Sequence, residues 1–250
     1  MRRKKISKNN NLKNIDVVIL CGGKGTRLRD TIGDCPKILA PIGNDVFLDI
    51  LLRNIISYGF KKVILSVGYM KEKIIDYCVE HNQDGLEIVF SKENYPLGTG
   101  GAVKKAGDYI KSDYFFIING DTLHNNIDFK KFYENHLDKN ALLSIALSKI
   151  DNISDCASVE INNSGKISAF KEKMPIKKRG LVSAGIYLMN NNIFKHMPDK
   201  DNFSIEYDFF PKIILNNNCY GFIHQGKFID IGAPDRYKMA NKLIQSKNKF

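Results

Sequence analysis

The first half of the chain alternates short apolar runs with segments in which apolar residues recur at helical spacing. Residues 15–21, IDVVILC, are largely β-branched and end at two glycines, which predicts a buried parallel strand. Asp45 and Gly59 bracket a helical segment as its predicted N-cap and C-terminal stop. This alternation predicts a doubly wound α/β sheet whose first four strands take the order 3-2-1-4. The predicted strands are 15–21, 62–67, 86–90 and 114–118, and the predicted helices are 46–58, 71–80 and 101–110.

The pattern changes after about residue 140, where the predicted strands become short. The sequence NNSG at 162–165 predicts the turn of a hairpin, and Pro234 suits the first turn of a final helix. We therefore predict an α/β half over residues 14–140 and a mixed α+β half over residues 141–250 of the same domain. The predicted elements are strands at 142–147, 158–161, 167–170 and 182–189, a helix at 205–215 and an extended segment at 219–230.

Charge is concentrated at the N-terminus. The chain of 250 residues is 43% hydrophobic, which is enough for a sizeable core. Its net charge of +11 would suit a nucleic-acid-binding protein, but more than half of that charge lies in residues 1–13. This segment contains no acidic residue, and we expect it to be a basic flexible arm. The remaining positive charge suits an anionic phosphate substrate equally well, so we expect no nucleic-acid partner.

The cysteine and hydropathy patterns predict a cytoplasmic protein. The five cysteines are scattered and include no C-x-x-C pair, which favours free thiols in a reducing compartment. No apolar stretch approaches the roughly 18 residues that span a bilayer, and no secretory signal follows the basic arm. We therefore expect no membrane partner.

A glycine-rich loop, Gly22-Gly23-Lys24-Gly25-Thr26-Arg27-Leu28, follows the first predicted strand. Glycines let backbone N–H groups approach a ligand, and the two cations add positive charge, so the loop suits a polyphosphate. It is not a dinucleotide fingerprint because a leucine replaces the third glycine, and it lacks the Gly-Lys-Ser/Thr of a P-loop. A glycine-rich turn can also be purely structural, so the loop alone leaves both alternatives open.

Three spaced elements favour the functional alternative. The run LCGGKGTRL, followed by Pro36-Lys37 and Ala40-Pro41, resembles the signature of the sugar-1-phosphate nucleotidyltransferases, or sugar-nucleotide pyrophosphorylases. The resemblance implies a Rossmann-like, glycosyltransferase-A-like nucleotidyltransferase fold with a nucleotide-binding half and a fused sugar-phosphate-binding half. It also implies that Arg27 neutralises the departing pyrophosphate and Lys37 the transferring phosphoryl group, in a reaction that depends on positioning and charge neutralisation. The triphosphate would be held by Leu20, Gly22, Gly23, Gly25 and Thr26.

Two further motifs complete the implied nucleotide site. Residues 97–102, LGTGGA, resemble the segment with which the family reads and packs the nucleobase, although alone they would suit a helix-capping loop. Asn119-Gly120 follows the fourth predicted strand, whose carboxyl end meets the glycine loop in a 3-2-1-4 sheet. The residues thus assigned to the nucleotide are Gly98, Thr99, Gly100, Gly101, Asn119 and Gly120.

Two aspartates form the predicted metal site. Asp121 follows Asn119-Gly120, where a carboxylate beside a triphosphate is a natural Mg²⁺ ligand. A lone aspartate at a strand end would more often belong to a turn, but this one has a partner. Asp230 lies in FIDIGAP, which resembles the family's D-I-G-T-P motif. The resemblance implies that both aspartates hold one Mg²⁺ against both phosphates.

The implied sugar-phosphate site lies in the second half. Residues 170–173, FKEK, resemble the family's F-x-E-K motif, in which Glu172 binds sugar hydroxyls and Lys173 grips the sugar phosphate. Alone, such a charge run would usually be solvated surface. Further family segments add Ser183, Gly185 and Glu206, the last of which either caps a helix or supports the sugar pocket.

The resemblance extends from Ile15 to about Met239 and is closest to the D-glycero-α-D-manno-heptose 1-phosphate guanylyltransferases. It implies an enzyme that makes an NDP-sugar and pyrophosphate from a nucleoside triphosphate, with GTP favoured, and a sugar 1-phosphate. A homo-oligomer is compatible with the sequence. Alternatives are a mannose-1-phosphate guanylyltransferase, a uridylyl- or cytidylyltransferase, and a catalytically silent nucleotide-binding subunit. The complete set of charged residues argues against silence.

Overall fold

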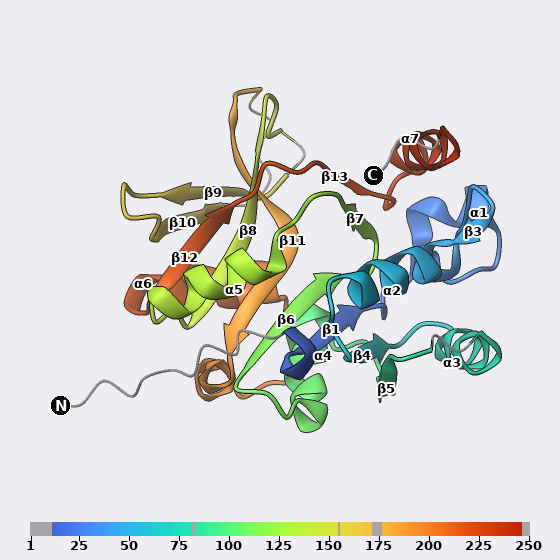
Figure 1. Cartoon of the computed structure of the whole chain (residues 1–250), viewed down its shortest axis with the longest axis horizontal. Coiled ribbons are helices and arrows are strands. Elements are labelled where there is room, and N and C mark those ends of the chain that lie inside the picture. The colour runs from blue at the N-terminus through green and yellow to red at the C-terminus, as the bar shows by residue number, and fades with distance from the viewer. Residues whose placement is uncertain (1–11, 82–83, 155, 172–176, 247–250) are drawn as a thin grey trace.

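The computed structural model describes residues 12–81, 84–154, 156–171 and 177–246. Residues 1–11 of the basic arm lie outside these ranges, as do Glu172 and Lys173 of the predicted sugar motif. Figure 1 shows a long twisted sheet that runs through the molecule and has helices packed around it.

The sheet is mixed and contains nine strands within the described residues. Seven of them follow the order β10-β9-β11-β6-β1-β4-β5, and β8 and β12 join it through β11. Strands β5, β4, β1 and β6 are parallel and confirm the predicted order 3-2-1-4, whereas β11 is antiparallel to β6. The bounds are β1 (Asp16–Leu20), β4 (Lys62–Val67), β5 (Glu87–Lys92), β6 (Tyr114–Asn119), β8 (Leu143–Ile150), β9 (Ser158–Ile161), β10 (Ile167–Lys171), β11 (Gly180–Asn190) and β12 (Cys219–Ile223).

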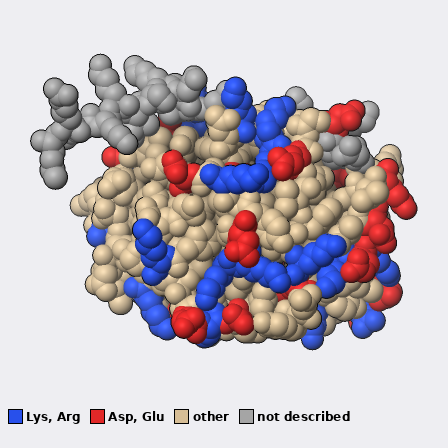
Figure 2. Space-filling view, turned by 90° about the horizontal axis from the view of Figure 1, so that it is seen from below, with Lys and Arg blue, Asp and Glu red and all other residues tan. Residues whose placement is uncertain are grey.

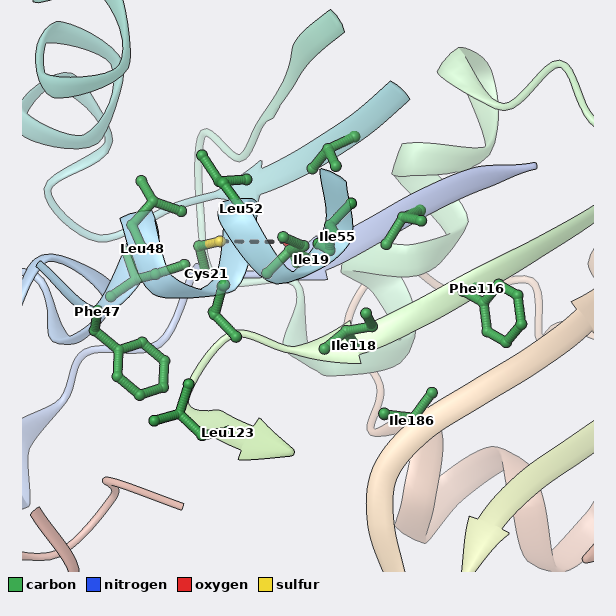
Figure 3. Close-up of a cluster of buried hydrophobic side chains, with 14 of the residues drawn as sticks. Ile19, Cys21, Phe47, Leu48, Leu52, Ile55, Phe116, Ile118, Leu123 and Ile186 are labelled. Carbon is green, nitrogen blue, oxygen red and sulfur yellow. Dashed lines mark hydrogen bonds between the residues drawn. The ribbon is translucent and has the colours of Figure 1, made fainter. Parts of the chain in front are cut away.

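The parallel part of the sheet separates two hydrophobic layers. Alternate residues of β1 point to opposite faces, so Val17 belongs to one layer and Val18 to the other. Helix α2 covers the first layer with Leu48 and Leu52, one helical turn apart (Figure 3). Helix α4 covers the second layer with Val103. Burial on both faces explains why this strand reads as a continuous apolar run.

Residues beyond 140 extend the same sheet. Strand β8 pairs with β11, and β12 pairs with β8. Strands β9 and β10 form a hairpin, and β9 also pairs with β11. Phe132 of α5 stacks on Phe222 of β12 with ring centroids 4.5 Å apart, which holds that helix on this part of the sheet.

The α-helices are α1 (Arg29–Ile32), α2 (Phe47–Ser57), α3 (Lys71–Glu80), α4 (Gly98–Ala106), α5 (Phe129–Asp138), α6 (Phe210–Asn216) and α7 (Pro234–Gln245). Shorter elements are η1 (Leu12–Asn14), η2 (Thr26–Leu28), η3 (Lys37–Leu39), η4 (Gly107–Tyr109), η5 (Asn191–His196), η6 (Ile205–Phe209), β2 (Pro41–Ile42), β3 (Asp45–Val46), β7 (Thr122–His124) and β13 (Phe228–Asp230).

Three helix boundaries differ from the prediction. Helix α4 begins at Gly98, three residues before the predicted start at residue 101. Asp45 is not the N-cap of α2: Val46 holds that position, and the Asp45 carboxylate instead lies 2.8 Å from the Arg53 guanidinium. The predicted helix at 205–215 begins as a π-helical turn, η6, before it continues as α6.

Packing against residues 201–203 explains why α4 begins with glycines. The Gly100 N–H donates to the carbonyl oxygen of Phe203 at 2.8 Å. A Cβ atom on Gly100 would lie 2.2 Å from the Phe203 ring, and one on Gly101 would lie 1.8 Å from the backbone oxygen of Asp201. No side chain fits at either position, so tertiary contact overrides the low helix propensity of glycine.

We predict that Gly101→Ala lowers the free energy of unfolding by about 1–3 kcal/mol, because the added methyl group must displace the backbone at Asp201. Urea denaturation measures this change. Gly23→Ala is the matched control, because its Cβ would meet no atom within 4 Å, and we expect a stability change within about 0.5 kcal/mol. Equal stability of the Gly101→Ala and wild-type proteins would contradict this packing role.

Candidate active site

A cavity of about 440 Å³ lies at the carboxyl ends of β1 and β6, between the glycine loop and the start of α4. Lys24, Lys37 and Asp121 are among the charged side chains that line it. It therefore combines cations and carboxylates in one concave site. The predicted nucleotide-binding residues that line it are Leu20, Gly22, Gly23, Gly98, Thr99, Asn119 and Gly120.

The ends of β1 and β6 bring these loops together. Leu20 pairs with Asn119, and the Gly120 N–H donates to the Leu20 carbonyl oxygen at 3.1 Å. A Cβ atom on Gly120 would lie only 2.5 Å from that oxygen, so this close approach requires glycine. The two segments then diverge, as they do at the switch point of a doubly wound sheet. Both therefore face the same cavity.

A two-stranded ribbon places the predicted metal residues beside each other. Strands β7 and β13 pair antiparallel with Thr122 opposite Asp230, and the Ile231 N–H donates to the Asp121 carbonyl oxygen at 2.8 Å. A Cβ atom on Gly232 would lie 2.9 Å from Asp230 Oδ1, 3.6 Å from Asp121 Oδ2 and 3.7 Å from Arg27 Nη2. Two carboxylates and a guanidinium from distant parts of the sequence thus converge on the space that glycine leaves open.

This arrangement suits a hard divalent cation. Carboxylate oxygens are the donors that Mg²⁺ prefers, and Mg²⁺ commonly takes one or two carboxylates together with substrate phosphates. Among the described residues, no group of three or more His, Cys, Asp or Glu side chains could hold a metal ion. A cation between Asp121 and Asp230 would therefore need phosphate or water oxygens to complete its coordination.

Lys37 forms an ion pair with one of these carboxylates. Its Nζ lies 2.7 Å from Asp121 Oδ2, while Thr122 Oγ1 donates to Asp121 Oδ1 at 3.1 Å. Burial alone would raise the pKa of Asp121, but the charge and hydrogen bond of Lys37 outweigh it and lower that pKa below its usual value. Asp121 is therefore a carboxylate throughout the neutral pH range.

Helix α7 packs against the segment after Lys37 and lies next to the predicted metal residue Asp230 in the sequence. The Tyr237 hydroxyl donates to the Pro41 carbonyl oxygen, and Asn241 Oδ1 accepts a hydrogen bond of 2.7 Å from the Gly43 N–H. The same helix begins directly after the motif that contains Asp230. It therefore holds two separate walls of the site in a fixed relation.

Glu93 is a cavity residue that the sequence analysis missed. Its side chain is buried, its Oε2 accepts a 3.1 Å hydrogen bond from the Leu97 N–H, and its Oε1 lies 2.5 Å from where a Gly22 Cβ would be. Burial raises the pKa of the carboxyl group, partly offset by the Leu97 N–H. In the sequence it stands in the polar run SKEN, which gives no sign that the chain buries it.

The structure brings three predicted sugar-site residues together behind Asn119. Gly185 has a φ of +74°, and a Cβ there would lie 2.8 Å from Asn119 Nδ2. The hydroxyl of the fully buried Tyr187 donates to Glu206 and lies 3.4 Å from Ser183 Oγ. Burial raises the pKa of Tyr187 well above its ordinary value, so its hydroxyl stays a donor. Glu206 thus supports this network from η6.

Several predicted site residues are not among those that line the cavity. Gly25 is the N-cap of η2, with a φ of +61°, and Thr26 is the first residue of η2. Gly100 and Gly101 pack against residues 201–203, so their contacts are structural. Glu172 and Lys173 lie outside the described residues.

Comparison with known proteins identifies the family. The nucleotidyl transferase model matches residues 16–247. The chain belongs to the nucleotidyl transferase family. It is 39% identical over 231 residues to the D-glycero-α-D-manno-heptose 1-phosphate guanylyltransferase of Aneurinibacillus thermoaerophilus, covering 92% of this chain and 99% of that protein. The enzyme of the same name from Campylobacter jejuni is 34% identical, covering 89% and 97%.

A solved structure agrees with this assignment. The crystal structure of HddC from Yersinia pseudotuberculosis matches with a TM-score of 0.83 and 36% identity, covering 92% of this chain and 99% of that chain. It confirms the nucleotidyltransferase fold predicted from the sequence. The protein is thus a sugar-1-phosphate nucleotidyltransferase, and its cavity has to accommodate the phosphates of two anionic substrates.

The surface of this nucleotidyltransferase carries charges of both signs. On the face seen in Figure 2, Lys and Arg side chains alternate with Asp and Glu side chains along a band. In the part of the chain that the structure describes, no helix has the length and apolar character needed to cross a membrane.

We predict that Lys37→Met raises the pKa of Asp121, because burial of the carboxyl group then acts without the opposing cation. Carbon NMR of the Asp121 carboxyl group against pH, with a chelator present, measures the shift. A carboxyl group with a depressed pKa stabilises the fold above its unfolded value of roughly 4 and loses this contribution as pH falls through the folded pKa. The stability difference between the two proteins should therefore disappear in acid.

Lys24→Met is the matched control, since it removes another lysine from the cavity but leaves the ion pair of Asp121 intact. An Asp121 pKa that is the same in the Lys37→Met and wild-type proteins would show that the ion pair does not control this group.

Proposed function

We propose that the enzyme transfers a guanylyl group from GTP to D-glycero-α-D-manno-heptose 1-phosphate, forming GDP-heptose and pyrophosphate with the assistance of Mg²⁺. The two curated relatives described above carry that activity in their names, and each aligns over nearly its whole length. The Yersinia protein was also solved in complex with GMP-PN, and that structure matches this chain with a TM-score of 0.82.

The convergence of Asp121, Asp230 and Arg27 around Gly232 carries the proposal. Asp121 also lines the cavity, so a nucleotide bound there would have its phosphates next to both carboxylates. Nucleotidyl transfer requires this combination, because two phosphate groups that repel each other must approach within bonding distance.

The chain's own residues would act by positioning and by charge. A phosphate oxygen of the sugar substrate attacks the α-phosphorus of the triphosphate, the bond to the β-phosphate breaks, and pyrophosphate leaves. The attacking oxygen is ionised at neutral pH, so no side chain has to remove a proton. Lys37 would neutralise the reacting phosphate and Arg27 the leaving pyrophosphate, while Asp121 and Asp230 would hold the Mg²⁺. That cation supplies charge neutralisation to the oxygens it contacts.

Glu93 supports guanine as the base. Guanine presents two adjacent donors, N1–H and the N2 amino group, on its Watson–Crick edge, and a carboxylate presents two acceptors. Each carboxylate oxygen has two lone pairs, so the oxygen that binds the Leu97 N–H retains capacity for a ligand. Glu93 lines the cavity together with Gly22 and the first turns of α4, so a base bound beside α4 would meet its carboxylate. We therefore assign base recognition to Glu93.

We also propose that the enzyme works in the cytoplasm and that its product feeds bacterial glycan synthesis. All five cysteines are free thiols, in agreement with a reducing compartment. As the family resemblance implies, Lys173 would bind the sugar phosphate and Glu172 the sugar hydroxyls; both lie outside the described residues.

Pyrophosphate release tests the proposal when four nucleoside triphosphates are crossed with the 1-phosphates of heptose, mannose, glucose and N-acetylglucosamine. We expect turnover with GTP and the heptose phosphate. Asp121→Asn and Asp230→Asn should each lower kcat by about 100-fold or more, because charge neutralisation by the metal contributes several kcal/mol. The exposed Asp84→Asn is the control. Turnover with another pair would show that the substrates are not GTP and the heptose phosphate. Nucleotide binding without pyrophosphate release from any pair would indicate a catalytically silent subunit.

A separate prediction concerns the base. Glu93→Gln should lower kcat/KM for GTP by roughly tenfold to a hundredfold, since a bidentate contact to a base contributes about 1–3 kcal/mol. Glutamine offers one donor and one acceptor, so the activity with UTP should rise relative to GTP. Glu87→Gln, at the exposed start of β5, is the matched control. An unchanged ratio of GTP to UTP activity would exclude Glu93 from base recognition.

A further inference from the structure

Arg236 contacts one of the two metal-site carboxylates and has no part in the reaction described above. It lies in the first turn of α7, and its Nε is 3.0 Å from Asp230 Oδ1. On the other side of the site, Lys37 makes a similar contact with Asp121. Each carboxylate that would bind the divalent cation is therefore already paired with a cation of the protein.

Asp230 is held in place without Arg236. The Gly232 N–H donates to the same oxygen, Oδ1, at 2.9 Å, and the pairing of β13 with β7 fixes the backbone of Asp230. Removing the guanidinium would therefore leave the orientation of the Asp230 carboxylate almost unchanged. What the guanidinium adds is a positive charge beside an oxygen that a divalent cation would use.

The strength of the repulsion between Arg236 and a divalent cation depends on how far the side chains are exposed to solvent. The side chains of Arg236 and Asp230 are 38% and 32% exposed, so solvent and salt screen the charge but do not cancel it. Repulsion between a guanidinium and a nearby cation in such a place is worth about 1 kcal/mol, or a few-fold in affinity. Among the described residues no third carboxylate, histidine or cysteine joins these two, so a weakened site depends all the more on ligands supplied by the substrate.

We propose that Arg236 lowers the affinity of the Asp121–Asp230 site for a free divalent cation and so makes cation binding depend on the phosphates of the nucleotide. A divalent cation at this site would then be held mainly while phosphate oxygens of a substrate or product are bound beside Asp121 and Asp230. This inference rests on the proposed metal role of the two aspartates.

Direct binding of Mn²⁺ to the full chain, without nucleotide, tests the inference by the electron paramagnetic resonance signal of free Mn²⁺. We expect Arg236→Gln to bind Mn²⁺ about threefold to tenfold more tightly than the wild type, because a repelling charge is gone. Arg236→Lys should stay close to the wild type. Lys238→Gln is the matched control, because it removes one positive charge from an exposed position two residues away on the same helix. The gain should shrink in high salt.

A second readout is the ratio of Mn²⁺ affinities with and without a non-hydrolysable GTP analogue, which should be smaller for Arg236→Gln than for the wild type. Equal or weaker Mn²⁺ binding by Arg236→Gln would overturn the inference, as would the absence of binding to both proteins. If Arg236→Gln binds Mn²⁺ equally or more weakly, but Asp121→Asn and Asp230→Asn abolish binding, the proposed metal site stands and only Arg236 loses its role. If they bind Mn²⁺ as the wild type does, the metal assignment itself fails. Circular dichroism and thermal melting check that each variant is folded.

Discussion

Asp121 and Asp230 lie beside each other because a short ribbon, β7 with β13, brings distant parts of the chain into one register. Thr122 lies opposite Asp230, and the buried Leu123 lies opposite the buried Ile229. Both apolar residues belong to the hydrophobic layer that contains Ile19 and Leu48, and Figure 3 shows Leu123 in it. A shift of the ribbon by one residue would turn Asp230 away from the site and expose the leucine or the isoleucine. Burial of an apolar pair thus fixes the distance between two charged groups.

The motif glycines have two distinct physical tasks. Gly120 allows one strand end to approach another, and Gly232 leaves open the space on which the carboxylates converge. Gly100 and Gly101 instead let α4 pack against the backbone of residues 201–203. The second task serves the first indirectly, since α4 forms one wall of the cavity and starts where that packing places it. A glycine motif in a sequence therefore does not distinguish ligand contact from backbone packing.

This difference explains what the sequence could predict. The positions of the parallel strands followed from apolar runs, because strands buried on both faces have a strong and local signal. Asp121, Asp230 and Arg27 could be assigned to one site because spaced motifs resemble those of a known family. Glu93 could not, because its burial depends on β5 and α4 packing around a polar run.

Boundaries and pairings set by tertiary contact were also beyond the sequence. Asp45 pairs with Arg53 two turns into α2, although its position suits an N-cap, and nothing local decides between the two. The contact of Arg236 with Asp230 depends on the angle at which α7 leaves β13. The sequence shows both residues but not that angle, so the charge balance of the site emerged only from the structure.

His124 does not alter that charge balance near neutral pH. Burial lowers the pKa of His124, three residues after Asp121, to about 3, so this imidazole stays neutral and packs against the ring of Phe228. Lysines, arginines and carboxylates are left to set the field around the phosphates. Carboxylates that are partly removed from water are costly unless paired, and the contacts of Lys37 and Arg236 offset that cost. Under the proposed metal role, a cation that joins the site would compete with these pairs, and phosphate oxygens of the substrate would supply part of its coordination.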